Sequence, residues 1–182
     1  MKIEQLAIEV IDRLNQSGIA YALVGAFSSS YWGIPRSTKD ADFVLQLSGA
    51  EINRLWDIFQ PDFVVSDQLT FETLTGSHKL EIRHPDAVFI VELFLLSADL
   101  HHQERFARRK LIQVFGRDIW MPTAEDVIIQ KIRWARAKDL EDAGNVLAVQ
   151  GDVLDFDYIR RWCAVHGTTE RLDALIASIP DI

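Results

Sequence analysis

Residues 33–45 read GIPRSTKDADFVL, a polar loop that enters an apolar strand through two aspartates. Asp40 and Asp42 stand two residues apart, and side chains at this spacing on a strand share one face of the sheet. At about 4–5 Å and an effective dielectric of about 20, two such carboxylates repel by roughly 3–4 kcal/mol. A hard divalent cation removes this repulsion because it prefers oxygen ligands. Asp40 and Asp42 are therefore candidate metal ligands, although an isolated acidic pair is more often a loop cap or a solvated turn.

A third carboxylate lies in the most apolar run of the chain, residues 87–96 (AVFIVELFLL). Glu92 sits near the middle of this run, where a charge is rarely placed unless it is paired or bound to metal. If this strand lies beside the strand of the two aspartates, three carboxylates can converge, hold Mg²⁺ and provide a base for an acceptor hydroxyl. The competing interpretation is an ion pair between Glu92 and a basic residue of the helical tail.

A glycine turn precedes the acidic pair along the chain. Gly25 follows a short apolar strand predicted at 20–24 and comes before a helix predicted at 26–32. A glycine at such a turn lets the backbone approach a phosphate closely, and the N-terminus of the helix offers free N–H groups. Ala26 continues the turn, and Ser28 adds a hydroxyl. An ordinary strand-to-helix turn is the alternative.

Three basic residues are further candidates for contact with a phosphate. Arg36 and Lys39 lie just before the acidic pair and can also serve only to balance its charge. Lys131 lies on a mostly apolar helix that Thr123 is expected to cap. It can extend to a phosphate or keep its ammonium in water while its stem packs on the helix.

The order of patterns predicts an α/β (α+β) fold, with a mixed sheet flanked by helices and a C-terminal helical segment. We expect residues 1–121 to form the α/β core and residues 122–182 to form a helical region packed on it. The expected elements are helices at 3–15, 26–32, 48–59, 99–108 and 123–138 with further helices to the end, and strands at 20–24, 40–45, 63–65, 69–74, 79–83, 87–96 and 111–121. Gly18 is expected to end the first helix, a capping box of Ser48 and Glu51 to open the third, and Gly76 to lie in a hairpin.

Composition narrows the function classes. The 182 residues carry a formal net charge of −8, from 19 basic and 27 acidic side chains, which disfavours non-specific binding of nucleic acid over the whole surface. A local basic patch remains open, formed by Arg105, Arg108, Arg109 and Lys110. We favour the interpretation of this basic run at 105–110 as a solvated helix end. Cys163 is the only cysteine, the first residues do not resemble a signal peptide, and the longest apolar run is too short to span a bilayer. We expect a cytoplasmic protein without membrane contact.

Taken together, these motifs resemble the nucleotidyltransferase superfamily of DNA polymerase β type. The resemblance rests on the turn at 23–26 (LVGA), the block at 33–42, the acid within 91–93 (VEL), and the tail segments 122–131 (PTAEDVIIQK) and 136–142 (RAKDLED). The similarity is greatest to the AbiEii-like abortive-infection nucleotidyltransferases and related uncharacterised bacterial proteins, and it covers roughly residues 20–165.

The resemblance implies Mg²⁺ as cofactor and transfer of a nucleoside monophosphate from a nucleoside triphosphate to a hydroxyl of tRNA, protein or a small molecule. It also implies a cognate toxin or antitoxin partner. The residues that it assigns to metal and catalysis are Asp40, Asp42 and Glu92, and those that it assigns to the nucleotide are Gly25, Ala26, Ser28, Arg36, Lys39 and Lys131.

Two positions depart from the family pattern. Ala26 stands where the family has a second glycine or a serine, and Glu92 stands where aspartate is usual. The first change weakens the expected phosphate contact, and the second lengthens the metal ligand by one methylene. A catalytically weak nucleotide-binding module of a toxin–antitoxin or regulatory system is therefore the second hypothesis. A purely structural role, with Arg36 and Lys39 neutralising the aspartates, is the third.

Overall fold

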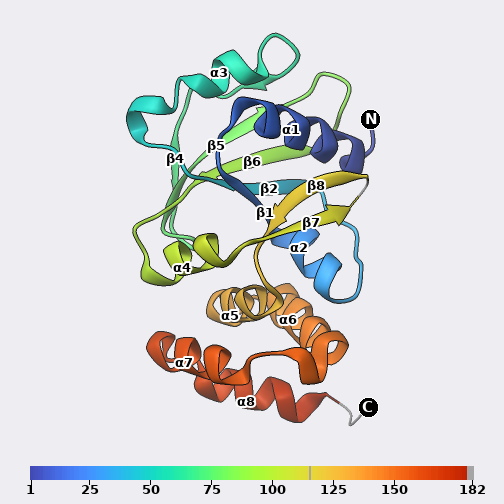
Figure 1. Ribbon diagram of the computed structural model, residues 1–182, viewed down its shortest axis with the longest axis vertical. Coiled ribbons are helices and arrows are strands. Elements are labelled where there is room, and N and C mark those ends of the chain that lie inside the picture. The colour runs from blue at the N-terminus through green and yellow to red at the C-terminus, as the bar shows by residue number, and fades with distance from the viewer. Residues whose placement is uncertain (115, 180–182) are drawn as a thin grey trace. The chain divides into compact units, whose positions relative to one another are not determined.

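The computed structural model describes residues 1–114 and 116–179 and divides them into two compact units (Figure 1). The sheet unit consists of Met1–Phe27 and Ser37–Met121. The helical unit consists of Ser28–Arg36 and the chain from Pro122 onward. The chain thus passes into the helical unit at Pro122, and a short earlier segment that includes most of the helix after the glycine turn also belongs to that unit.

The main sheet of the sheet unit is mixed, as the sequence predicts. Its strand order is β1-β2-β6-β5-β3, and β4 also pairs with β5. The pairing of β2 with β6 is parallel, and the other pairings in this sheet are antiparallel. The strands are β1 (Tyr21–Val24), β2 (Asp40–Leu45), β3 (Val64–Val65), β4 (Thr70–Glu72), β5 (Ser77–Arg83) and β6 (Ile90–Leu95).

One face of this sheet carries the main apolar core. Along β2, Ala41, Phe43 and Leu45 are fully buried and alternate with the residues of the other face. They pack with the apolar sides of α1 (Ile3–Ser17) and α3 (Arg54–Phe59). Period-two alternation therefore leaves Asp40, Asp42 and Val44 on the opposite face.

The opposite face holds a smaller apolar cluster. It is formed by Ala22, Val24, Val44 and Phe94 from three neighbouring strands, together with Phe106 of α4 (Leu100–Arg108). Asp99 caps α4 by accepting a hydrogen bond from the amide of His102 at 3.0 Å. This face is therefore apolar where α4 contributes and polar where the carboxylates stand.

Two local expectations change in detail. The capping box of Ser48 and Glu51 forms, but it caps a short 3₁₀ turn, η1 (Gly49–Glu51), and α3 starts only at Arg54. The strand candidate at 111–121, which the sequence breaks at Gly116, forms a hairpin of β7 (Lys110–Val114) and β8 (Arg117–Met121). Gly116 adopts a positive φ of 69°, which favours reversal of the chain there.

The helix expected from Thr123 to about 138 is wrong in its end point. Thr123 caps α5 (Ala124–Trp134) as predicted, but Ala135 takes a left-handed conformation with φ 57° and ends the helix. A new helix, α6 (Ala137–Gln150), follows from Arg136. The break was not expected because a left-handed cap is usually glycine or asparagine rather than alanine.

The helical unit packs around its own apolar core. After α6 come a 3₁₀ turn, η2 (Gly151–Val153), and the helices α7 (Phe156–His166) and α8 (Thr169–Ser178). Trp32, at the end of α2 (Gly25–Trp32), packs against this core. Its indole N–H donates to the carbonyl of Pro122 at 2.9 Å, and Gln150 donates to the carbonyl of Trp32 at 2.7 Å. Within the described residues, the helices lack the length and hydrophobicity needed to cross a bilayer.

Gly33 lies so close to the backbone of α6 that a side chain does not fit. A Cβ atom there would stand 3.0 Å from the carbonyl oxygen of Ser29 and 3.0 Å from the amide nitrogen of Val146. Because both atoms are backbone, Gly33→Ala is expected to destabilise the protein by about 1–3 kcal/mol in chemical denaturation. Gly49→Ala is the control, since nothing lies within 4 Å of its added Cβ. Equal stabilities of the two variants would contradict this packing.

Candidate active site

The parallel pairing of β2 with β6 brings the predicted carboxylates onto one face. Asp42 is the register partner of Glu92, and Asp40 is the partner of Ile90. Neighbouring strands lie about 5 Å apart, and paired residues project to the same side. Asp40, Asp42 and Glu92 therefore stand on the polar part of the sheet face opposite α1 and α3, and all three are partly exposed.

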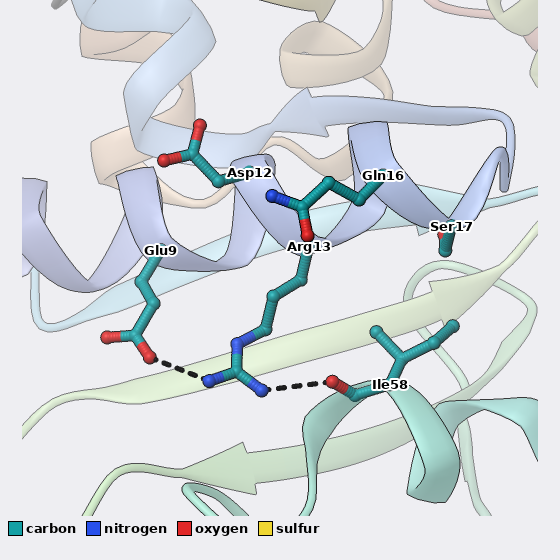
Figure 2. A pocket seen from close by; sticks show the side chains of 6 residues that line it. All are labelled: Glu9, Asp12, Arg13, Gln16, Ser17 and Ile58. Carbon is teal, nitrogen blue, oxygen red and sulfur yellow. Dashed lines mark hydrogen bonds and ion pairs between the residues drawn. The ribbon is translucent and has the colours of Figure 1, made fainter.

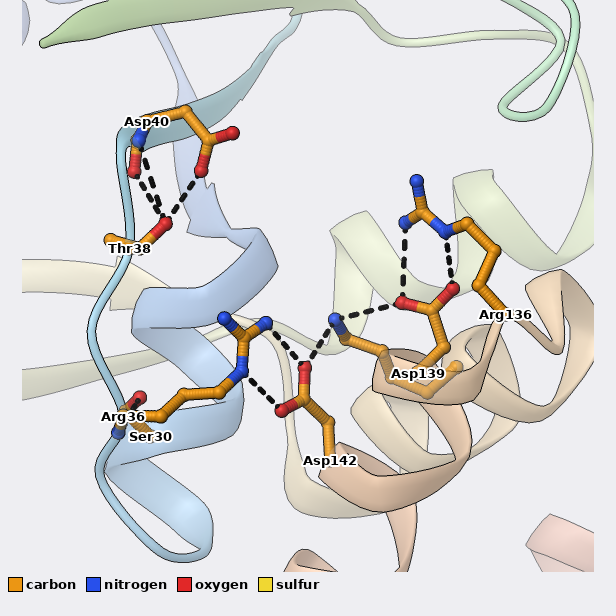
Figure 3. A network of polar contacts seen from close by, with 8 residues as sticks. Ser30, Arg36, Thr38, Asp40, Arg136, Asp139 and Asp142 are labelled. Atoms are coloured by element: carbon orange, nitrogen blue, oxygen red, sulfur yellow. Dashed lines mark hydrogen bonds and ion pairs between the residues drawn. The ribbon is translucent and has the colours of Figure 1, made fainter.

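Asp40 is held at the start of β2 by a neighbouring hydroxyl. Thr38 Oγ1 donates to Asp40 Oδ1 at 2.6 Å (Figure 3). The backbone amide of Asp40 also lies 3.5 Å from the same hydroxyl oxygen. The threonine of the loop thus fixes the orientation of the first carboxylate, a role that the sequence analysis did not assign to it.

Asp42 lies directly against the glycine turn. Its register partner on β1 is Val24, and Gly25 follows with a positive φ of 63°. A Cβ atom on Gly25 would stand only 1.9 Å from Asp42 Oδ2. The glycine is therefore required for two reasons, its backbone conformation and the space that the carboxylate occupies. The glycine turn and the Asp42 side chain therefore pack directly against each other.

Glu92 makes an ion pair with Lys79, which the sequence analysis did not single out. Lys79 Nζ donates to Glu92 Oε1 and lies 3.9 Å from Glu81 Oε1. Both partners come from β5 and β6, so the cation is supplied by the adjacent strand and not by the helical tail. The spacing of Lys79 and Glu81 predicts that both side chains lie on one face of β5. Their pairing with β6 depends on the register between the two strands, which the local pattern does not reveal.

The surroundings of Lys79 keep it charged. Burial opposes the charged form, but the hydrogen bond and negative charge of Glu92, with smaller contributions from Glu81 and Glu72, outweigh it and raise the pKa of Lys79. Within the described residues, no group of three or more His, Cys, Asp or Glu side chains is arranged to hold a metal ion. Oxygen donors of the type that Mg²⁺ prefers are present, but Glu92 is turned to its lysine.

In the helical unit, Arg36 and Lys131 are engaged in a network of ion pairs. Arg36 binds both oxygens of Asp142, at 2.6 and 2.9 Å, and Lys131 Nζ lies 2.7 Å from the same carboxylate (Figure 3). Lys131 also donates to Asp139 at 3.2 Å, and Arg136 donates to Asp139 at 2.5 Å. Lys131 and both aspartates are buried. Two predicted phosphate ligands are thus bound to carboxylates within the helical unit.

The other candidate residues have varied environments. Ala26 and Ser28 are buried, with 6% and 2% exposure, whereas Lys39 is exposed. The expectation of a solvated helix end at 105–110 is wrong for part of that run. Arg105 is buried, and the guanidinium of Arg109 stacks on the rings of Phe106 and Trp120, at 4.1 and 4.8 Å from their centroids.

A surface depression lies on the α1 side of the sheet unit (Figure 2). Its cation, Arg13, donates to Glu9 at 3.1 Å and to the carbonyl of Ile58 at 3.0 Å. The depression is lined by Glu9, Asp12, Arg13, Gln16, Ser17 and Ile58. Because α1 packs on the face opposite the carboxylates, this depression is separate from the candidate active site.

The mixed sheet flanked by helices matches the fold of several solved nucleotidyltransferase structures. The chain is similar to the solution structure of the antibiotic-resistance factor ANT(2'')-Ia, with a TM-score of 0.62, 12% identity and 97% coverage of both chains. It is also similar to the lincosamide antibiotic adenylyltransferase LnuA bound to lincomycin, with a TM-score of 0.56, 10% identity and coverage of 82% of this chain and 98% of that one.

A third similar structure is an antigenic nucleotidyltransferase-like protein from Paracoccidioides brasiliensis. Its TM-score is 0.54, its identity is 20%, and the match covers 96% of this chain and 92% of that one. No protein-family model matches the sequence, and no curated protein matches it significantly. At these identities the structural matches define the fold alone.

Gly25→Ala tests the contact between the glycine turn and Asp42. The added Cβ collides with the Asp42 carboxylate, and the alanine must also adopt the left-handed backbone conformation of Gly25. The free energy of unfolding is therefore expected to fall. Gly76→Ala is a matched control because Gly76 has φ 64° and nothing within 4 Å of an added Cβ. In urea denaturation, we expect the control to lose about 1–2 kcal/mol of unfolding free energy. Gly25→Ala is expected to lose roughly 2 kcal/mol more. An equal loss in both would remove the evidence for close contact.

The lowered pKa of Asp142 predicts that the stability of the helical unit depends on pH. Burial would raise its pKa, but hydrogen bonds and charge from Arg36 and Lys131 outweigh burial and hold the pKa at about 2, against an ordinary 3.8. This pair network therefore stabilises the fold above about pH 4, and the contribution of roughly 2 kcal/mol is lost as the pH falls through about 2.

Asp142→Asn should weaken this acid dependence and lower the stability at pH 7 by about 3 kcal/mol, because buried Lys131 and partly exposed Arg36 lose the carboxylate they share, while Lys131 keeps Asp139. Asp173→Asn is the control in the same unit, since Asp173 pairs with Arg160 at the surface and its loss should cost less than about 1 kcal/mol. Thermal unfolding at a series of pH values distinguishes the two. A wild-type acid transition retained in Asp142→Asn would contradict the assignment.

Proposed function

We propose that the protein is a Mg²⁺-dependent nucleotidyltransferase that transfers a nucleoside monophosphate from a nucleoside triphosphate to an acceptor hydroxyl and releases pyrophosphate. The observation that carries the proposal is the register of β2 with β6, which sets Asp42 beside Glu92 and leaves Asp40 on the same face. The contact of Asp42 with the Gly25 turn supports it further, because this turn opens a helix next to the carboxylates.

The two aspartates are proposed to hold the metal with the triphosphate. When bound, Mg²⁺ would neutralise negative charge that develops on the phosphate oxygens during the displacement. Thr38 orients Asp40 for this role through its hydroxyl hydrogen bond. Gly25 keeps the Asp42 carboxylate unobstructed. The donor set suits a hard cation because each ligand offers carboxylate oxygen.

Glu92 is proposed as the third carboxylate of the site and as the base. The acceptor oxygen attacks the α-phosphorus, its proton passes to the Glu92 carboxylate, and the bond from phosphorus to the leaving pyrophosphate oxygen breaks. The side chain of Glu92 is 22% exposed, so an acceptor can reach it. Its ion pair with Lys79 keeps the carboxylate on this face of the sheet.

The nucleotide contacts are proposed to come first from the turn. The backbone of Gly25 and Ala26 begins α2 and can offer N–H groups to phosphate oxygens. Lys39 is exposed beside the aspartates in the chain and can add positive charge. The hydroxyl of Ser28 is a further candidate. Arg36 and Lys131 are weaker candidates, because both are bonded to Asp142 in the helical unit.

The first class of acceptor to test is a small molecule with a hydroxyl group. Two of the similar structures are of proteins named for antibiotics, one an antibiotic-resistance factor and one a lincosamide antibiotic adenylyltransferase. A tRNA end and a protein hydroxyl are the other candidate acceptors. The net charge of −8 disfavours a long nucleic-acid footprint but permits contact with a single tRNA end.

A second candidate function is a nucleotide-binding module that does not turn the nucleotide over, within a toxin–antitoxin or regulatory pair. The observation in its favour is the Lys79–Glu92 ion pair, since it engages the carboxylate on which catalysis depends. The two functions differ in one product. A transferase releases pyrophosphate when a suitable acceptor is added, whereas a binding module takes up nucleotide and releases none.

Asp42→Asn tests the proposal directly. The substitution keeps the size of the side chain but removes a charged metal ligand, so the affinity for a non-hydrolysable nucleoside triphosphate with Mg²⁺ is expected to fall more than about tenfold. Isothermal titration calorimetry measures this loss. Asp67→Asn serves as the control because Asp67 is an exposed carboxylate elsewhere in the sheet unit. Equal affinities of wild type and Asp42→Asn would refute the metal assignment.

A further inference from the structure

Lys79 is the cation at the centre of a strongly acidic sheet face. The face carries Asp40 and Asp42 on β2, Glu92 on β6 and Glu81 on β5. Glu81 is the register partner of Glu92, so these two carboxylates face each other across the β5–β6 pair. Lys79 contacts Glu92 directly and lies 3.9 Å from Glu81. Arg83 also donates to Glu81, at 3.1 Å, so Glu81 has two cationic neighbours, whereas the cation next to Glu92 is the ammonium of Lys79.

The position of this ammonium is set by the surrounding strands. The side chain of Lys79 is only 17% exposed, and its nitrogen lies 5.8 Å from the centroid of the Phe94 ring. Phe94 is also the register partner of Lys79. The aromatic ring and the two carboxylates thus surround the ammonium on the same face, and a cation in this place is stabilised by both.

We propose that Lys79 is a resident counter-cation that takes the place of a second metal ion at Glu92, so that the site uses one divalent cation, the one held by Asp40 and Asp42 with the nucleotide. The proposal rests on the proposed function above. In two-metal sites, paired cations about 3.5–4 Å apart stabilise the attacking and the leaving oxygen. Here the ammonium supplies positive charge on the side of the attacking oxygen.

Lys79 positions the Glu92 carboxylate and takes no part in bond formation or proton transfer. Its ammonium keeps its proton throughout, while Glu92 accepts the proton of the acceptor hydroxyl through its carboxylate. Positive charge from Lys79 holds Glu92 on the face and balances the negative charge that gathers there. It also repels a free divalent cation, so metal is expected to bind weakly before the nucleotide arrives.

Direct measurement of Mn²⁺ binding without nucleotide tests this role independently of activity. Electron paramagnetic resonance of free Mn²⁺ gives the affinity of the full chain. Lys79→Met is expected to bind Mn²⁺ about tenfold more tightly than wild type, because a positive charge beside the carboxylates is lost. Lys79→Arg, which keeps the charge, should match wild type. Adding Glu92→Gln to Lys79→Met should cancel the gain.

Lys110→Met is the matched control for the loss of one lysine. Lys110 is exposed on β7 in the same unit, so its removal should leave the Mn²⁺ affinity unchanged. An affinity of Lys79→Met equal to that of wild type, or an equal gain in Lys110→Met, would overturn the proposal. Lys79→Gln provides the same comparison with a polar side chain if the methionine variant does not fold.

The wild-type protein supplies a second readout that needs no variant. Titration with Mn²⁺ at saturating non-hydrolysable nucleoside triphosphate is expected to give one bound Mn²⁺ per chain, and two would overturn the proposal. The proposed function can survive that result, since Asp42→Asn would still weaken metal-dependent nucleotide binding. If Asp42→Asn leaves that binding intact, the proposed function itself fails.

Discussion

The parallel pairing of β2 with β6 is the constraint on which the rest of the site depends. It places Asp42 opposite Glu92 and sends Ala41, Phe43 and Leu45 to the other face, where α1 and α3 bury them. A shift of one residue would move the aspartates into that apolar core and expose the apolar residues, so the core enforces the register. The hydrophobic face therefore determines where the carboxylates stand.

Such a concentration of negative charge needs compensation, and the two units provide it differently. In the sheet unit, Lys79 pairs with Glu92, Glu81 lies near both Lys79 and Arg83, and Asp40 accepts a hydrogen bond from the Thr38 hydroxyl. In the helical unit, Asp142 and Asp139 are almost completely enclosed and share three cations. The first arrangement leaves carboxylates partly exposed and available to a ligand, whereas the second serves to hold the fold.

The sequence predicts those features that local chemistry determines. The capping box at Ser48, the cap at Thr123 and the strand that begins with Asp40 and Asp42 all follow from short patterns, and the structure contains each of them. The partner of Glu92 could not be predicted, because it depends on the register between β5 and β6. The end of α5 was also missed, because Ala135 adopts a conformation that alanine rarely takes.

The central claim is that Asp40 and Asp42 hold one metal–nucleotide complex on the polar sheet face, with Glu92 beside them on β6. Paramagnetic broadening of backbone amide signals by Mn²⁺ with a non-hydrolysable nucleoside triphosphate tests it most directly, since the effect falls steeply with distance from the ion. We expect broadening at residues 40–42 and 90–92 and none around Arg13, which lines the depression on the α1 side. Broadening centred on Arg13, or sharp signals along β2 and β6, would contradict the account.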